Sequence, residues 1–263
     1  MEANSVLAAA QAIATARRSR LPLGPLPAHL QPEDEATGYE IQHQIHWLLA
    51  EHAGDFAGYK IGCTSKVMQD YLKIPHPCAG GIFAGAIHQS GAMLRAADFV
   101  CVGVECEIAI RLARDLLPSD APFTEQHVAE AIGECHPAIE IVDDRYAKWE
   151  TLGAPTLIAD DFFAAGCVLG TAVKAEALPD LAAIQGRAII NGALAGEGTG
   201  ADVLGHPHQA LAWLANHLAG RGDGLEAGQI VLTGSLVKTV WLKAGDRVVM
   251  ELDGLGTVEV GFD

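Results

Sequence analysis

Apolar positions follow a helical spacing in the first part of the chain and strand-like spacings later. Residues 4–19 are rich in alanine and predict an amphipathic helix, with Asn4 or Ser5 as its N-cap. Several prolines then mark a connecting loop. A second helix is predicted from about residue 32 to residue 51, because proline and acidic residues open it and a helical apolar pattern follows.

From Gly58 onward, short β-branched runs alternate with glycine and proline, which is the pattern of β-strands. Strands are predicted near 57–62, 81–88, 101–112, 137–143, 166–172, 186–192, 229–234, 246–252 and 256–262. Helices are predicted near 65–72, 124–133, 178–184 and 207–219. Asn191-Gly192 predicts a hairpin turn. A turn at 243–246 is predicted to lead into a hairpin of 247–251 with 257–260.

The order of these elements predicts the fold class. Strands far outnumber crossover helices after residue 100, so a doubly wound parallel sheet is not expected. We predict an α+β fold, a mixed β-sandwich roll with helices packed outside it. Residues 1–55 are predicted to form a small helical N-terminal segment, and residues 56–263 a β-roll domain that carries the candidate catalytic residues.

Composition supports a large core and argues against some partners. Half of the 263 residues are hydrophobic and the mean hydropathy is +0.21. The formal net charge of −16 argues against nucleic acids and anionic membranes, because both would repel the chain. The six cysteines form no C-x-x-C pair and mostly lie in apolar runs, which favours reduced, buried thiols. Without a signal-peptide pattern or a bilayer-spanning segment, we expect a cytoplasmic protein.

Two glutamates, Glu105 and Glu107, interrupt an otherwise apolar run from residue 101 to residue 110. Residues two apart point to the same face of a strand, so both acids share the face that the bulky apolar residues leave free. A third acid, Glu140, interrupts another β-branched run at 136–143. Carboxylates placed side by side in buried strands cost several kcal/mol unless a cation or a proton compensates them.

Three carboxylates without cysteine or histidine at ligand spacing favour a hard cation such as Mg²⁺ or Mn²⁺, with water or substrate completing its shell. The alternative is that Glu105 and Glu107 lie on a solvated face, as acids in antiparallel strands usually do. The third acid, in a second apolar run, favours the metal site without excluding this alternative.

Three further segments carry polar groups in apolar surroundings. Lys60 lies between glycines in a predicted strand that leads into a Thr-Ser helix cap, and burial would lower its pKa and make it a usable acid or base. An ordinary lysine on a strand face is the commoner situation. The Thr233-Gly234-Ser235 turn could bind a carboxylate or simply end its strand. Asp160 and Asp161 precede an aromatic run and could orient other groups or cap a turn.

Several common functional motifs are absent. The chain has no P-loop, no G-x-S-x-G nucleophile elbow and no H-E-x-x-H zinc motif. Gly254-Leu255-Gly256 lies in the last strand region rather than at a strand-to-helix turn, so it gives no support for a dinucleotide site. His206-Pro207-His208 opens a predicted helix, which favours capping over metal binding.

Taken together, the ordered motifs resemble the 2-keto-4-pentenoate hydratase / 4-oxalocrotonate decarboxylase family, within the fumarylacetoacetate hydrolase superfamily. The matching segments are G-Y-K-I-G-x-T-S at 58–65, E-x-E at 105–107, P-A-I-E-I-V-D at 137–143, I-A-D-D at 158–161, A-L-A-W-L-A-N at 210–216, V-L-T-G-S-L at 231–236 and G-D-R-V near 245–248. The resemblance implies a fumarylacetoacetate hydrolase-like roll and a homo-oligomer, with which a related pathway enzyme can associate.

The resemblance also implies roles for individual residues. It implies that Mg²⁺ or Mn²⁺ is held by Glu105, Glu107 and Glu140. It implies that Lys60 is a catalytic lysine near the carboxylate and 2-oxo groups of a small 2-oxo or 2-hydroxy-dienoic acid. The residues expected beside this substrate are Ile61, Cys78, Asp160, Thr233 and Ser235.

Two segments depart from the family pattern. Cys78 stands where the hydratases carry an acid that serves proton transfer or water activation. Asp161 stands where asparagine is common, and Phe162 and Phe163 stand where small residues are expected. The two phenylalanines predict a narrower or more apolar pocket.

The leading hypothesis is a metal-dependent hydratase that adds water to a 2-hydroxy-2,4-dienoate, giving a 4-hydroxy-2-oxo acid, in meta-cleavage type catabolism. One alternative is a 4-oxalocrotonate-like decarboxylase, which needs a cationic contact for its second carboxylate. Candidates for that contact are Lys66, Lys73, Arg145 and Lys238. The others are an acylpyruvate C–C hydrolase and a non-catalytic partner subunit that keeps the fold and the metal.

Overall fold

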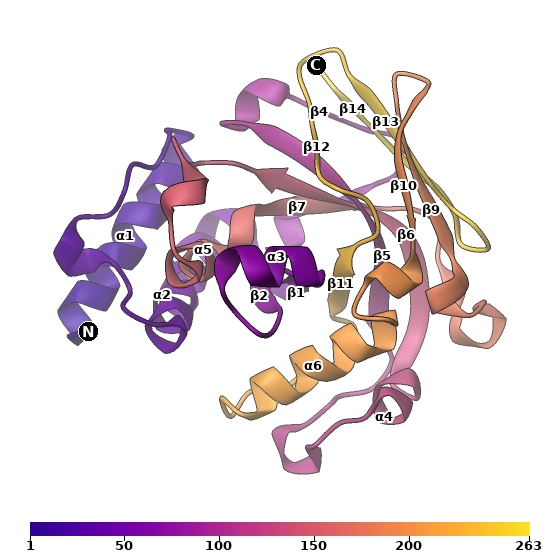
Figure 1. The fold of residues 1–263 in the computed structure, drawn as a ribbon, viewed down its shortest axis with the longest axis horizontal. Helices are drawn as coiled ribbons and strands as arrows, with labels where there is room; N and C mark the ends of the chain where they lie inside the picture. The colour runs from indigo at the N-terminus through magenta and orange to yellow at the C-terminus, as the bar shows by residue number, and fades with distance from the viewer.

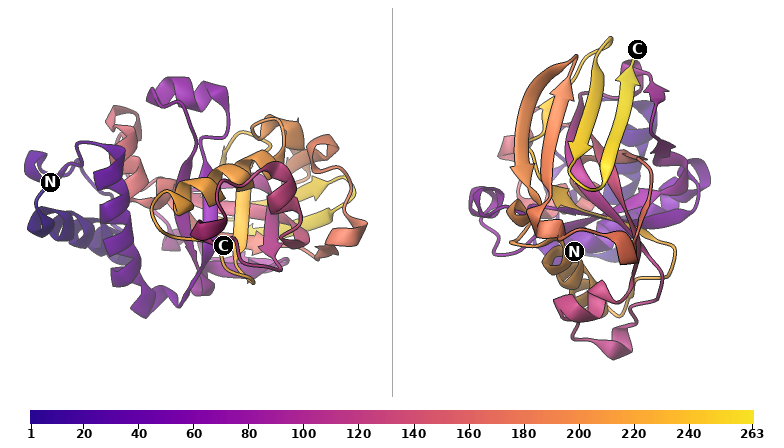
Figure 2. Two further views of the ribbon diagram at one scale, coloured as in Figure 1. Left: turned by 90° about the horizontal axis from the view of Figure 1, so that it is seen from below. Right: turned by 90° about the vertical axis from the view of Figure 1, so that its right-hand side faces the viewer.

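The computed structural model describes residues 1–263 as two β-sheets with helices around them (Figure 1). The α-helices are α1 (Ala3–Ser19), α2 (Glu35–Ala53), α3 (Lys66–Leu72), α4 (Glu125–Ala129), α5 (Ala154–Ala159) and α6 (Pro207–Ala219). Figure 2 shows α1 and α2 at one end of the molecule, with the last two strands at the other end. No helix combines the length and the apolar character needed to cross a membrane.

Nine strands form the large sheet, in the order β2-β1-β11-β5-β6-β7-β3, with β12 paired to β5 and β8 paired to β6. These strands are β1 (Phe56–Gly62), β2 (Cys78–Phe83), β3 (Ile87–Gln89), β5 (Val102–Leu112), β6 (Ile132–Asp143), β7 (Ala164–Leu169), β8 (Val173–Lys174), β11 (Ile230–Ser235) and β12 (Val240–Trp241). Within this sheet, only β1 with β11 and β3 with β7 run parallel.

Five strands form the small sheet, in the order β10-β9-β13-β14-β4. They are β4 (Ala92–Leu94), β9 (Gln185–Ile190), β10 (Ala193–Thr199), β13 (Arg247–Leu252) and β14 (Gly256–Phe262). The predicted hairpins at Asn191-Gly192 and at 247–260 are confirmed as the pairs β9–β10 and β13–β14. The predicted mixed sandwich roll is therefore confirmed.

The helical N-terminal segment packs directly on the roll. Its cluster of 11 buried residues includes Ile13 of α1 and Ile45 of α2 together with Phe83 of β2 and Ala159 of α5. A separate cluster of 46 buried residues forms the main core. A division of the chain at residue 55 stays a prediction, because apolar contacts cross that point.

Some predicted helix bounds are wrong. The first helix begins at Ala3, so Asn4 and Ser5 lie in its first turn and neither is the N-cap. The second begins at Glu35, because the Asp34 carboxylate accepts the Thr37 N–H at 2.8 Å and caps it.

Two other predicted helices are much shorter than expected, because the β-strands that follow them begin early. The helix predicted at 124–133 ends at Ala129, since β6 already pairs with β5 from Ile132 onward. The one predicted at 178–184 is a single 3₁₀ turn, Leu181–Ala183, since β9 begins at Gln185.

Predictions are also wrong or missing where the elements are very short. The strand predicted at 81–88 is divided into β2 and β3 by a 3₁₀ turn at Ala84–Ala86. The short elements α5 and β4 were not predicted, because six and three residues carry too little periodicity. His206 caps α6 by accepting the His208 N–H, as predicted. All six cysteines are free thiols, and four are buried, whereas Cys101 is exposed.

An aromatic cluster joins α2 to α6 around His217. Its ring lies 4.6 Å from that of Tyr39 and 5.1 Å from that of Trp213, measured between centroids. The Nε2 atom of His217 is buried without a hydrogen-bond partner. Burial, together with Arg221 and His76, lowers the pKa of His217 to about 4.

This low pKa predicts a pH-dependent stability. Between about pH 6.5 and pH 4 the unfolded chain binds a proton that the folded His217 does not, so the free energy of unfolding should fall as the pH falls. His217→Phe should flatten this fall in urea unfolding followed by circular dichroism. His208 has a similarly lowered pKa and should keep some slope. The exposed-site control His29→Gln should leave the slope unchanged, and an unchanged slope in His217→Phe would contradict the assignment.

Candidate active site

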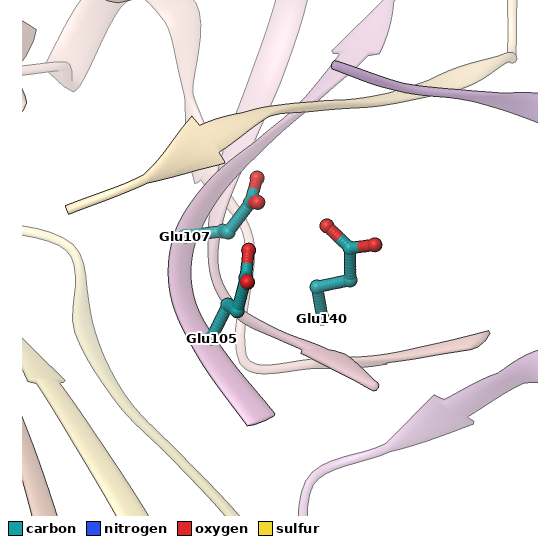
Figure 3. A group of neighbouring side chains, drawn as sticks. All are labelled: Glu105, Glu107 and Glu140. Atoms are coloured by element: carbon teal, nitrogen blue, oxygen red, sulfur yellow. The ribbon is translucent and has the colours of Figure 1, made fainter. Parts of the chain in front are cut away.

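Three carboxylates meet on one face of the large sheet. The antiparallel register of β5 and β6 places Glu105 opposite Glu140, and Glu107 lies two residues along the same face of β5. One oxygen from each residue lies within 4.8 Å of the other two. Figure 3 shows both side chains of β5 directed to the same side as Glu140. The structure therefore brings together the three predicted metal ligands.

Burial makes this cluster electrostatically unfavourable by itself. Glu107 is 0% exposed, Glu140 is 1% exposed and Glu105 is half-buried. Burial, reinforced by Glu140 and Glu105, raises the pKa of Glu107 well above its usual value. Burial also raises the pKa of Glu140 to about 7, although Lys60 acts in the opposite direction. Three charges here need cationic compensation beyond one lysine. The alternative of a solvated face is wrong.

The free oxygens of the cluster fit a metal ion. Glu107 Oε1 and Glu140 Oε2 are buried without a hydrogen-bond partner. Their neighbours hold the carboxylates in place, because Gly234 N–H donates to Glu107 Oε2 at 2.8 Å and the Thr239 hydroxyl donates to Glu105. A buried set of oriented carboxylates with unpaired oxygens is the donor set of a hard divalent cation.

Lys60 belongs to the same cluster. It lies in β1 between β2 and β11, is 4% exposed, and its Nζ is 3.0 Å from Glu140 Oε1. Burial alone would lower the pKa of Lys60, but the carboxylates of Glu140, Glu105 and Glu107 outweigh burial and raise it above the ordinary value. The predicted lowering of this pKa is therefore wrong for the metal-free site. Lys60 carries a proton there.

Three other residues that were predicted to contact the substrate have structural roles in the sheet. The Thr233 hydroxyl donates to the Ile108 carbonyl at 3.0 Å, and the Ser235 hydroxyl donates to the Val237 carbonyl at 2.6 Å. Ile61 is 1% exposed in the main core, on the face of β1 opposite Lys60. Substrate contact by these three residues stays a prediction.

Cys78 is buried and lies opposite Gly62 in the pairing of β1 with β2. A hydrogen bond with the Cys63 thiol, together with burial, raises the pKa of Cys78 far above its ordinary value. The Cys78 thiol is therefore neutral and cannot replace the expected acid as a base.

Asp160 is fully buried and bonded to arginine. Arg145 Nε donates to its carboxylate at 2.9 Å, and Arg17 of α1 lies 3.6 Å away. Arg145 is thereby engaged, and Lys66 pairs with Asp70 at the surface at 2.7 Å. The remaining candidates for a second-carboxylate contact, Lys73 and Lys238, are exposed.

No pattern in the sequence indicated that Asp161 would be anchored from the N-terminal helices. Its carboxylate accepts from Arg17 at 2.7 Å and from the Gly81 N–H at 2.9 Å, and lies 2.7 Å from His46 Nε2. Although burial would raise it, His46 and Arg17 hold the pKa of Asp161 well below its usual range. Two adjacent acids in apolar surroundings signal a need for cations, but not which ones.

The anchored carboxylate supports a strained backbone. Asp161, Phe162 and Phe163 have φ values of 55°, 49° and 66°, in the left-handed region that side chains rarely adopt. Gly80 makes room for this segment, since a Cβ there would lie 2.7 Å from the Asp161 carbonyl oxygen. The strain sets the direction of Phe162, whose side chain lies beside Gly62.

The sequence also matches a known protein family. The model of the fumarylacetoacetate (FAA) hydrolase C-terminal family matches residues 82–262. The chain belongs to the fumarylacetoacetate hydrolase family. The matched region contains all three glutamates of the cluster, whereas Lys60 and Cys78 precede it. The family resemblance predicted from the motifs is confirmed.

Full-length relatives of this family member include enzymes that act on dienoates. It is 36% identical over 256 residues to 2-hydroxyhexa-2,4-dienoate hydratase of Comamonas testosteroni, covering 96% of this chain and 95% of that protein. It is 33% identical to 2-keto-4-pentenoate hydratase of Burkholderia vietnamiensis, covering 98% of each. The solved structure of 4-oxalocrotonate decarboxylase from Pseudomonas putida G7, complexed with magnesium and adipate, matches with a TM-score of 0.94 and 26% identity, covering 100% and 99%.

Removing one charge from the cluster should separate stability from metal binding. Glu107→Gln keeps an acceptor for Gly234 and relieves repulsion, so it should stabilise the metal-free protein by about 1–2 kcal/mol. It should also abolish the rise in melting temperature that Mn²⁺ produces over EDTA in the parent protein. Glu134→Gln, on the same face of β6 but paired with Lys174, is the control that should retain the Mn²⁺ effect. A full Mn²⁺ effect in Glu107→Gln would rule out the site.

Proposed function

We propose that this protein is a divalent-metal-dependent hydratase that adds water to a 2-hydroxy-2,4-dienoate and yields a 4-hydroxy-2-oxo acid, in meta-cleavage type catabolism. The observation that carries the proposal is the buried cluster of Glu105, Glu107 and Glu140 with the Lys60 ammonium 3.0 Å from Glu140. Hydratases that share about a third of its residues over nearly the full length support it.

The proposed chemistry needs an electron sink at one end of the substrate. A divalent cation on the three carboxylates would supply it, by polarising the 2-oxygen of the bound acid. Lys60 Nζ lies 3.0 Å from Glu140 Oε1, so an ammonium at this position could neutralise charge that develops on the 2-oxygen or pass on a proton. The nearly complete burial of Lys60 and Glu140 keeps bulk water away, which strengthens these interactions.

Cys78 favours a second candidate function. Hydration requires a base that removes a proton from the attacking water, and the neutral Cys78 thiol cannot be that base. A 4-oxalocrotonate-like decarboxylase loses CO₂ into the same electron sink and needs no activated water. The full-length match to a decarboxylase structure supports this candidate. A C–C hydrolase of acylpyruvates also needs activated water, so Cys78 lends it no support.

The remaining features of the proposal concern its cation and assembly. We propose Mg²⁺ or Mn²⁺ as the ion, supported by the all-carboxylate donor set and by the magnesium in the decarboxylase structure. A cytoplasmic homo-oligomer, with which a related pathway enzyme can associate, is proposed from the family resemblance.

Product analysis distinguishes the two candidate reactions. ¹H NMR should show a 4-hydroxy-2-oxo acid formed from 2-hydroxypenta-2,4-dienoate with Mg²⁺ or Mn²⁺, and none with EDTA. Loss of CO₂ from 2-hydroxymuconate without hydration of the pentadienoate would assign the decarboxylase instead. No reaction of either substrate, with metal binding retained, would assign a non-catalytic partner.

Removal of the lysine tests its role in catalysis. Lys60→Met should lower kcat by about 10²–10⁴-fold, the usual contribution of proton transfer by a positioned group, while Mn²⁺ still raises the melting temperature. Lys174→Met removes an exposed lysine that is also paired with a glutamate of β6, and should keep kcat within about twofold of the parent value. Equal activities of the two variants would exclude Lys60 from the reaction.

A further inference from the structure

We propose that four aromatic side chains, Phe162, Phe163, Trp149 and Tyr71, receive the tail of the substrate and select an alkyl tail over one that ends in a carboxylate. They are called the aromatic line below. The proposal rests on the proposed function for the position of the substrate's 2-oxo acid end at Lys60.

The aromatic line begins at Lys60. A Cβ built on Gly62 would lie 3.3 Å from Lys60 Nζ and 3.7 Å from Phe162 Cβ, so both side chains converge on the same point of β1. Phe162 is only 5% exposed, and the anchored left-handed backbone of residues 161–163 fixes its direction. A substrate whose head contacts Lys60 therefore has an apolar ring as its next neighbour.

From Phe162 the line leads outward to solvent. Ring centroids are 6.4 Å apart between Phe162 and Phe163, 5.9 Å between Phe163 and Trp149, and 5.6 Å between Trp149 and Tyr71. These spacings are typical of aromatic pairs in contact. Tyr71, in α3, is 50% exposed. These ring contacts join residues of three segments, namely α3, the 3₁₀ turn at Trp149–Thr151 and residues 162–163.

Charges near the aromatic line disfavour a second carboxylate. Arg145 is the closest arginine in sequence, but it donates to the Asp160 carboxylate and to the carbonyls of Phe163 and Ala164. Lys66 is paired with Asp70 at the surface. Glu150 follows Trp149 in the chain, and it adds to burial in raising the pKa of Asp144.

The two other lysines of this region are solvent-exposed. Lys73 follows α3, and Lys148 precedes Trp149. Water and salt screen the attraction between such surface charges and a bound group. A terminal carboxylate on the aromatic line would thus lose hydration without gaining a buried cation, whereas an alkyl tail would gain apolar contact.

Binding of saturated 2-oxo acids tests this selectivity without any turnover. Isothermal titration of the Mg²⁺-loaded protein should give affinities that rise about fourfold per added methylene from 2-oxobutanoate through 2-oxohexanoate to 2-oxooctanoate. The diacid 2-oxosuberate, of the same chain length as 2-oxooctanoate, should bind at least about tenfold more weakly. Equal or tighter binding of the diacid, or affinity that does not change with chain length, would overturn the proposal.

Variants of the aromatic line test the residues themselves. Trp149→Ala and the milder Phe163→Leu should weaken 2-oxooctanoate binding by about five- to tenfold and leave 2-oxobutanoate within about twofold. Trp149→Arg should reverse the preference towards 2-oxosuberate. Trp47→Ala removes a tryptophan that is 73% exposed on α2, away from the line, and should change nothing. If Trp149→Ala weakened the binding of 2-oxooctanoate and of 2-oxobutanoate to the same extent, the proposal would be overturned.

The outcome is independent of the reaction that the enzyme performs. An alkyl preference in a protein that fails to hydrate dienoates would disprove the proposed function and leave the tail assignment intact. Hydration without an alkyl preference would do the opposite. If the protein binds Mn²⁺ but no 2-oxo acid at any chain length, the tail assignment is wrong.

Discussion

The burial of three carboxylates on two paired strands is the constraint on which the rest of this structure depends. Such a cluster is unstable unless cations reach it and its oxygens are held in place. Lys60 from β1 meets the first need in part, and the turn after β11 meets the second through Gly234. The order β1-β11-β5-β6 in the large sheet is what brings these segments together. The fold thus prepares a position for one more cation.

A second pair of acids is treated differently. Asp160 and Asp161 are as deeply buried as Glu107 and Glu140, but Arg145 and Arg17 already compensate them, and His46 contacts Asp161. The ion pairs and hydrogen bonds of these two acids stabilise the backbone conformation of the residues that follow. Three successive left-handed residues persist only where the surroundings fix them. One acidic cluster therefore leaves room for a ligand, while the other shapes the wall beside it.

The sequence predicted the glutamate cluster because strand periodicity is a local property. Alternation alone placed Glu105 and Glu107 on one face, and a similar run indicated Glu140. The contacts of Arg17 with Asp161 span 144 positions, and no local pattern encodes them. The left-handed phenylalanines were equally invisible, since nothing in their identity favours that backbone. Element bounds failed where tertiary pairing decided them, as at Ala129, where β6 replaces the predicted end of the helix.

The contact between Arg17 and Asp161 links the first helix to the site in thermodynamic terms. If α1 opened locally, Asp161 would lose its arginine partner and the backbone of Phe162 would lose part of its support. Local unfolding of α1 would therefore lower the free energy that keeps residues 161–163 ordered beside Lys60. An element outside the region that the family model matches thereby becomes part of the cooperative unit that holds the surroundings of Lys60.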